Sequence, residues 1–194
     1  MILVIDTSAS RWFVAVIGDD GTGRTLVEST DRPDLARVYK DAGRPSKVAV
    51  ATGPGSFTGL RVGVSFGVGL AMGLRIPIFP LPSLDLQAAR STIPATAVVE
   101  AGRGRVYFQA PGGKPMHGDA ADVPESHPLV GNVGEKSEAA LVAAGHRFVQ
   151  AAELRDFAAA AAIVLESARE VSYGSVEITY MQSFSIPTKS EPSA

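Results

Sequence analysis

Runs of apolar residues near the start of the chain predict three short strands joined by tight turns. The residues from Ile2 to Ile5 are continuously apolar, which is typical of a buried strand. Residues 12–17 and 24–28 predict the second and third strands, and Gly21 lies in the turn between them. Consecutive strands with such short connections pair as an antiparallel meander.

Helical spacing and further strands follow in alternation. A helix is predicted from Pro33, which can start it, to Gly43, which can end it. The other elements predicted in the first part of the chain are a strand at 47–51, a glycine-rich loop at 52–56, a helix at 58–74, an extended segment at 78–80 and a helix at 84–90. The second part predicts strands at 97–100 and 105–109, an irregular stretch at 111–128, a strand and turn at 129–134, a helix to Ala144, a short strand at 147–149 and an Ala-rich helix at 154–171.

This order of elements predicts an α/β protein built from two small related halves. Each half opens on a strand hairpin with an acidic residue at the turn, Asp6 in the first half and Glu100 in the second. We therefore predict an N-terminal half at residues 1–95 and a C-terminal half at residues 96–186. Residues 187–194 are polar and contain proline, which predicts a disordered tail.

Composition and charge narrow the classes of function. The net charge is -2, the pI is about 5.9, and no cluster of Lys and Arg occurs, so direct binding of nucleic acid by this chain alone is disfavoured. The chain has no cysteine, which excludes thiol catalysis and Cys-based metal sites and fits a cytoplasmic protein. The three histidines, His117, His127 and His146, lie singly, so no metal centre is expected.

No membrane association is expected from the sequence. The first residues predict a strand and lack the basic segment of a signal peptide. The most apolar stretch, Val62 to Phe79, is interrupted by four glycines, by Arg75 and by Pro77. A membrane span needs roughly 20 predominantly apolar residues, so this stretch predicts an ordinary helix.

The most distinctive motif is the glycine-rich segment between the strand at 47–51 and the helix that follows it. Gly53 and Gly55 permit tight turns, and a positive φ is expected at Gly55. Ser56 or Thr58 can cap the helix by accepting hydrogen bonds from its first free N–H groups. The helix start is an anion site in principle, while a structural turn with a helix cap is the simpler interpretation.

A stripe of glycines runs along the predicted helix. Gly59, Gly63 and Gly67 are spaced by four residues, and Gly69 and Gly73 form a second pair at the same spacing. Each glycine weakens a helix by roughly 1 kcal/mol relative to alanine, so a close contact must offset the cost. The contact is either with another element of the same chain or with a helix of a partner subunit, and the pattern leaves both open.

Asp6, Thr7 and Ser8 form the turn after the first strand. Such a turn faces nucleotide phosphates in actin-like and sugar-kinase-like proteins, where the acid holds a metal through water and hydroxyls bond a phosphate. The alternative is a turn in which Asp6 bonds its own nearby backbone. Asp6 and Glu100 could also face each other across a cleft, although a plain hairpin at Glu100 is the simpler interpretation.

The run from Gly53 to Gly63, GPGSFTGLRVG, closely resembles the TsaB (YeaZ) family, the paralogues of the TsaD/Kae1 ATPase. The resemblance covers most of the chain and is strongest from Val48 to Leu84. It extends to five further segments, at residues 2–8, 69–84, 103–107, 129–134 and 176–180. The chain departs from the family at residues 31–34, where the first helix is shortened, and at 100–102 and 180–182.

The resemblance implies an actin-like ASKHA (ribonuclease H-like) fold whose nucleotide cleft has degenerated, with no cofactor, metal or catalytic residue. It implies a non-catalytic partner subunit that supports the TsaD-type transferase in making threonylcarbamoyladenosine (t6A) at position 37 of tRNA. The expected partners are the TsaD-type transferase, the TsaE-type ATPase and a second copy of the chain, with tRNA reached only through the complex. The partner interface is expected on the stripe of Gly59, Gly63 and Gly67.

Two other functions compete with this hypothesis. The first is a nucleotide-binding ATPase or kinase of the same fold that acts alone, with Asp6 as the metal-linked acid. The second is a peptidase, which the sequence disfavours because it shows no nucleophile elbow, no cysteine and no paired histidines.

Overall fold

The computed structural model describes residues 1–181, so the tail predicted at 187–194 lies outside the described residues. A first, five-stranded sheet has the order β3-β2-β1-β4-β5. The predicted antiparallel meander is confirmed, since β1 pairs antiparallel with β2, and β2 with β3. The strands are β1 (Ile2–Asp6), β2 (Trp12–Ile17), β3 (Gly23–Ser29), β4 (Lys47–Ala51) and β5 (Ile78–Leu81). Strand β4 pairs parallel with β1, and β5 pairs parallel with β4.

A second, four-stranded sheet repeats the topology of the first four strands. Its order is β8-β7-β6-β9, with an antiparallel run from β6 to β8 and a parallel pairing of β6 with β9. Its strands are β6 (Thr96–Gly102), β7 (Arg105–Gln109), β8 (Met116–Gly118) and β9 (Leu129–Asn132). Residues 111–128 were predicted to be irregular, and this prediction is corrected, because they contain β8 and a short helix at 120–122. The polar residues of this stretch interrupt the apolar pattern from which such elements are predicted.

Within residues 1–181, five α-helices cover the sheets: α1 (Leu35–Ala42), α2 (Phe57–Leu74), α3 (Ser83–Ala89), α4 (Glu135–Ala143) and α5 (Phe157–Leu165). Helix α1 begins after Asp34 and not at Pro33, because the Asp34 side chain accepts from two backbone N–H groups of the first turn. Helix α5 is half as long as the predicted 154–171, and the strand predicted at 147–149 is reduced to one bridge between Leu129 and Phe148.

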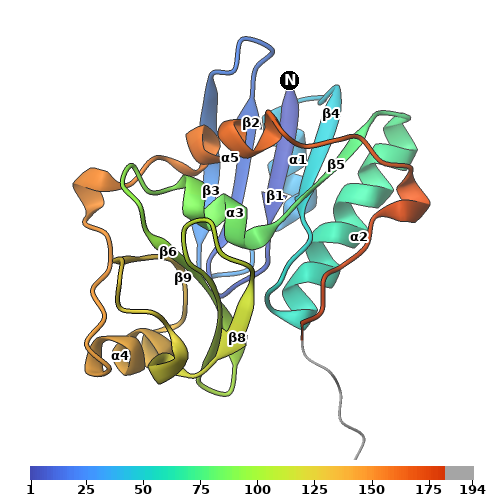
Figure 1. Cartoon of the computed structure of the whole chain (residues 1–194). Helices are drawn as coiled ribbons and strands as arrows, with labels where there is room; N and C mark the ends of the chain where they lie inside the picture. Colours follow the sequence, from blue (N-terminus) through green and yellow to red (C-terminus); the bar gives the residue numbers. More distant parts are fainter. Residues whose placement is uncertain (182–194) are drawn as a thin grey trace, which may run out of the picture.

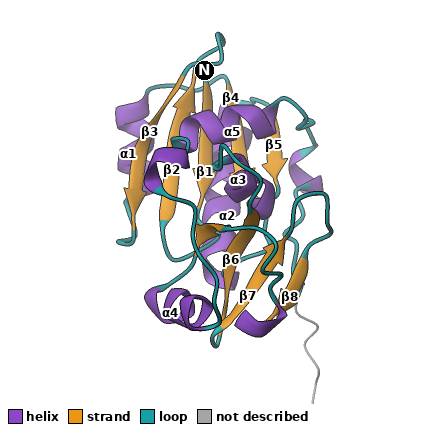
Figure 2. Cartoon of the chain, turned by 60° about the vertical axis from the view of Figure 1, so that its left-hand side comes forward, coloured by secondary structure: helices purple, strands orange, loops and turns teal. Residues whose placement is uncertain are grey.

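Helices lie on both faces of the first sheet (Figure 1). Alternate residues of its strands pack against α1 and α2 on one face and against α3 and α5 on the other. The second sheet packs on α4 with one face and contacts α3 with the other, so α3 lies between the two sheets. Figure 2 shows the sheets one below the other, with α3 near their junction.

The predicted boundary at residues 95 and 96 falls between α3 and β6. The chain does not stay with the second sheet after this boundary, because α5 packs on β2 and β3. The segment after α5 also returns to the first sheet, where Val171 bridges Ile78 and the Thr179 N–H donates to the Thr52 carbonyl at 2.8 Å.

Candidate functional site

The turn of Asp6, Thr7 and Ser8 at the end of β1 is buried, with 0–2% of each residue exposed. The Asp6 and Thr7 side chains bond within the chain, whereas the Ser8 hydroxyl is buried without a partner. The Asp6 carboxylate accepts from the Ser8 N–H at 2.9 Å, and the Thr7 hydroxyl donates to the Gly59 carbonyl at 2.7 Å. The structure therefore matches the alternative in which Asp6 bonds its own nearby backbone. The turn does not present its hydroxyls to a ligand.

The glycine-rich segment covers this turn. The Ser56 N–H donates to the Ser8 carbonyl at 2.6 Å. A Cβ atom at Gly55 would lie 2.2 Å from the Ser8 carbonyl oxygen, and one at Gly59 would lie 2.0 Å from that of Thr7. Such distances are far below van der Waals contact, so only glycine allows the segment to lie this close. One of the two alternatives from the sequence places a phosphate beside this turn. In the structure, the chain itself fills that space.

The reasons for the glycines in this segment differ from those expected. Gly53, and not Gly55, has a positive φ, of +104°. Gly55 is required by its close approach to Ser8. Ser56 is the helix cap, since its hydroxyl accepts from the Gly59 N–H at 3.3 Å, while Thr58, two residues later, is exposed.

The stripe of Gly59, Gly63 and Gly67 faces the sheet of its own chain. Each is buried, and a Cβ at Gly63 or Gly67 would lie 2.2 Å from the Thr7 hydroxyl or from Val50. These three glycines therefore have the intrachain role, and the placing of a partner contact on them is corrected. Gly69 lies on the opposite, exposed face, and nothing lies within 4 Å of a Cβ built there.

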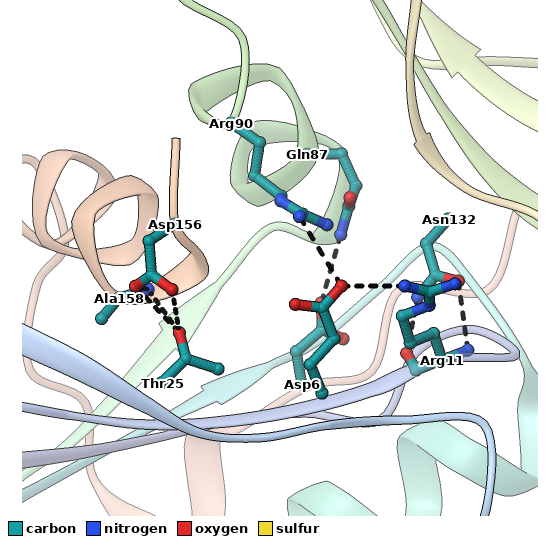
Figure 3. Close-up of polar contacts among 9 residues, drawn as sticks. Asp6, Arg11, Thr25, Gln87, Arg90, Asn132, Asp156 and Ala158 are labelled. Carbon is teal, nitrogen blue, oxygen red and sulfur yellow. Dashed lines mark hydrogen bonds and ion pairs between the residues drawn. The ribbon is translucent and has the colours of Figure 1, made fainter. Parts of the chain in front are cut away.

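Gln87 of α3 and Arg90, which follows the last residue of this helix, point toward Asp6 (Figure 3). Gln87 Nε2 donates to Asp6 Oδ2 at 3.4 Å, while Gln87 Oε1 is buried without a partner. Burial raises the pKa of Asp6, against the lowering effects of the Ser8 hydrogen bonds and of the Arg90 charge. Neither Gln87 nor Arg90 was predicted as a site residue. Their spacing of three was the available signal, because it places two polar side chains on one side of a helical segment.

Asn132 joins the second sheet to the turn between β1 and β2 (Figure 3). Its side-chain oxygen accepts from the Arg11 N–H at 3.1 Å and from the Ser10 hydroxyl at 3.2 Å. Its amide nitrogen donates to the Arg11 carbonyl. The Arg11 side chain pairs with Glu28 at 2.9 Å, and Glu28 lies 3.9 Å from Arg90. This network was not predicted either, because its members are distant in sequence.

Glu100 does not face Asp6. Its two carboxylate oxygens accept from the Gly134 N–H at 3.0 Å and from the Ser137 hydroxyl at 2.9 Å, at the start of α4. A cavity of about 300 Å³ separates the hairpin of β6 and β7 from the glycine-rich segment. In the described part of the chain, no group of three or more His, Asp or Glu side chains could hold a metal ion.

The fold and site together define an α/β protein of two related halves, in which the turn after β1 is covered by the chain itself. A family model described as TsaD, tRNA N6-adenosine threonylcarbamoyltransferase, matches residues 37–157. The chain is 43% identical over 120 residues to TsaB from Bacillus subtilis, covering 55% of this chain and 52% of that protein. It is 29% identical over 123 residues to TsaB from Escherichia coli, covering 55% and 53%.

A solved structure of YeaZ from Pseudomonas aeruginosa superposes with a TM-score of 0.66 at 18% identity, covering 93% of this chain and 99% of that one. This likeness confirms the predicted fold class. The chain belongs to the TsaD-type family and, within it, to the TsaB (YeaZ) group that the sequence resembles. In sequence it spans about half the length of the curated relatives it matches.

Proposed function

We propose that this chain is a non-catalytic partner subunit in tRNA threonylcarbamoyladenosine biosynthesis. Its curated relatives are named after this process. The observation that carries the proposal is the covered turn at Asp6. A kinase or ATPase of this fold needs an acid and hydroxyls open to phosphate. Here the Thr7 hydroxyl is bonded to α2, and Gly55 lies against the Ser8 backbone.

The outer face of α2 is the surface by which we propose that the subunit binds its partner. Only 33% of the residues of this helix are buried. By length and composition alone, the helix is long and apolar enough to cross a membrane. Its buried face packs on the chain's own sheet, as in the core helix of an α/β protein. Phe57, Val62 and Met72 are 38–54% exposed on this helix. An exposed apolar face of this kind is typical of a protein–protein contact.

Small residues favour a helix as the partner of this face. Ser65, Gly69 and Gly73 follow one another at a spacing of four, and no atom lies within 4 Å of a Cβ at either glycine. Another helix could therefore approach closely. The proposed partners are the TsaD-type transferase and, in its absence, a second copy of this chain. The TsaE-type ATPase would then join through that assembly in the cytoplasm.

Substitution of Val62 by lysine tests this surface. A charge placed at the centre of an apolar contact must be desolvated without a partner, so Val62→Lys should weaken capture of the TsaD-type protein at least tenfold. Val142→Lys is the matched control, because Val142 is an equally apolar and 55% exposed residue on α4. Capture is measured by titration calorimetry with the purified TsaD-type protein, and folding by circular dichroism.

Two results would contradict the proposal. If folded Val62→Lys still binds with wild-type affinity, the outer face of α2 is not the contact. If the wild-type chain does not bind the TsaD-type protein, and alone hydrolyses ATP in a reaction lost on Asp6→Ala, the solitary ATPase is the better interpretation.

A further inference from the structure

The cavity between the start of α2 and the hairpin of β6 and β7 has no role in the proposed function. Its walls are the glycine-rich segment and first turn of α2 on one side and the hairpin on the other, with Tyr180 at the edge. Its volume of about 300 Å³ is at the lower end of the range for small-molecule sites, about 300–1,000 Å³. We propose that this cavity binds a small organic anion with a flat, apolar body.

The first turn of α2 supplies hydrogen-bond donors for the anion. The helix is 18 residues long, and the hydroxyl of its cap, Ser56, accepts from the Gly59 N–H alone among the N–H groups of the first turn. The N–H groups of Phe57 and Thr58 have no acceptor within the described residues. Free N–H groups and the helix dipole together favour an anion at this position. The Arg61 guanidinium, 3.8 Å from the centre of the Phe57 ring, adds a positive charge beside them.

A buried tyrosine on the opposite wall supports a ligand independently of the helix. Tyr107 lines the cavity and is only 4% exposed. Its ring contacts His117, but its hydroxyl makes no hydrogen bond to any residue in the part of the chain that the structure describes. The side chain is thus largely buried while its hydroxyl has no bond within the chain, so the hydroxyl can donate to a ligand in the cavity. Burial also raises the pKa of Tyr107, which keeps this proton available for donation.

The aromatic residues define the body of the ligand. Phe57 and Tyr180 lie with ring centres 5.4 Å apart at the mouth of the cavity. Together with Tyr107 they offer surfaces on which a flat group can stack. Glu100 also lines the cavity, but both of its oxygens accept hydrogen bonds at the start of α4. The anionic group therefore belongs at α2, away from this carboxylate.

Three probes test the site on the full chain alone, so the result does not depend on any TsaD-type partner. Phenyl phosphate and AMP should bind, as measured by titration calorimetry and by shifts of amide NMR signals at residues 55–58 and 100–107. Inorganic phosphate should bind at least tenfold more weakly because it lacks the flat body. Tighter binding of AMP would identify a nucleoside monophosphate as the ligand class, and tighter binding of phenyl phosphate a small aromatic acid.

Substitutions separate the two donor groups. Phe57→Ala removes the ring, whereas Phe57→Pro removes the ring and the N–H. Proline is tolerated at this first helical position, since Ser56 before it is extended, with φ -58° and ψ 120°. Phenyl phosphate should therefore bind about tenfold more weakly to the proline variant than to the alanine variant.

Tyr107→Phe should also weaken binding about tenfold without lowering the melting temperature, because its hydroxyl has no partner to lose. Tyr39→Phe, on α1, is the control that removes a hydroxyl elsewhere. The proposal is overturned if none of the probes binds at millimolar concentration, or if inorganic phosphate binds as tightly as phenyl phosphate. Equal affinities of wild type, Tyr107→Phe and both Phe57 variants would overturn it as well.

Discussion

Gly67 and Gly69 lie two residues apart on α2 and serve opposite purposes. Gly67 is buried against Val50 of β4, whereas Gly69 is exposed and has open space beside it. Both cost helix propensity, because glycine loses more backbone entropy than alanine on folding. The cost at Gly67 is offset by close packing in the chain, and we propose that the cost at Gly69 is offset by close packing of a partner helix.

Alanine at these two positions should change stability in opposite directions. A Cβ at residue 67 would lie 2.2 Å from Val50 Cγ1, so Gly67→Ala should destabilise the fold by about 1–3 kcal/mol through overpacking. Gly69→Ala should stabilise the monomer by up to about 1 kcal/mol. Urea unfolding at two protein concentrations separates folding from self-association. Equal destabilisation by both substitutions would mean that Gly69 is also packed within the chain.

Asp6 should make stability fall as the pH rises. Burial raises its pKa above the usual 3.8, so between the unfolded and folded values the native state binds more protons than the unfolded state. The contribution of Asp6 to stability is therefore present at low pH and is lost as the pH rises through the folded pKa.

Asp6→Asn should remove this loss. An asparagine oxygen can still accept from the Ser8 N–H. Its amide nitrogen can donate to the unpartnered Gln87 Oε1 once the Gln87 amide turns over, because Gln87 Nε2 faces this position in the wild type. Relative to this variant, the wild type should lose stability from about pH 4 upwards, as measured by urea unfolding across a pH series. A wild type that gains on the variant as the pH rises would show that the hydrogen bonds at Asp6 outweigh its burial.

At the scale of elements, α5 shows how one polar residue sets a helix start. A helix was predicted from residue 154, but it begins after Asp156. The Asp156 carboxylate accepts from the Ala158 N–H at 2.8 Å and from the Thr25 hydroxyl of β3 at 2.8–2.9 Å. It therefore caps α5 and also attaches it to the first sheet.

Loss of this cap should cost more than loss of an ordinary one. Asp156→Ala is expected to destabilise the protein by about 2 kcal/mol. Asp34→Ala is the matched control, since Asp34 caps α1 with bonds to Ala36 and Arg37 only, and should cost about 1 kcal/mol. Chemical unfolding of the two variants measures the difference, and equal costs would mean that the bond to Thr25 contributes nothing.

At the scale of the molecule, two sheets of matching topology are held together by α3 and by Asn132. The segment beyond α5 adds a third connection, because it runs back across β4 and β5. The two halves are therefore consecutive in their strands, while their helices and the end of the described chain are shared. This arrangement places the glycine-rich segment against the turn after β1.

The sequence by itself determined most strands and most helices, because apolar runs, turn residues and caps act over a few residues. It predicted β2, β4 and β7 with their observed bounds and the meander, and it limited the helix cap to Ser56 or Thr58. Strand β8 was missed. The resemblance of GPGSFTGLRVG to one family was also readable without coordinates. A stripe of glycines has a local cost in helix propensity, and this cost indicates that a close contact must offset it.

Only the tertiary structure decided what makes each contact. Spacing cannot tell whether a glycine stripe faces a sheet or a partner, so Gly59, Gly63 and Gly67 were assigned to the wrong surface. The same limit applies to Asp6, whose burial depends on Gly55 and Gln87, residues 49 and 81 positions away. Long-range contacts also attached the start of α5 to Thr25 and paired Asn132 with Arg11. These outcomes depend on which distant surfaces meet, and the energy of that meeting is not encoded in any local pattern.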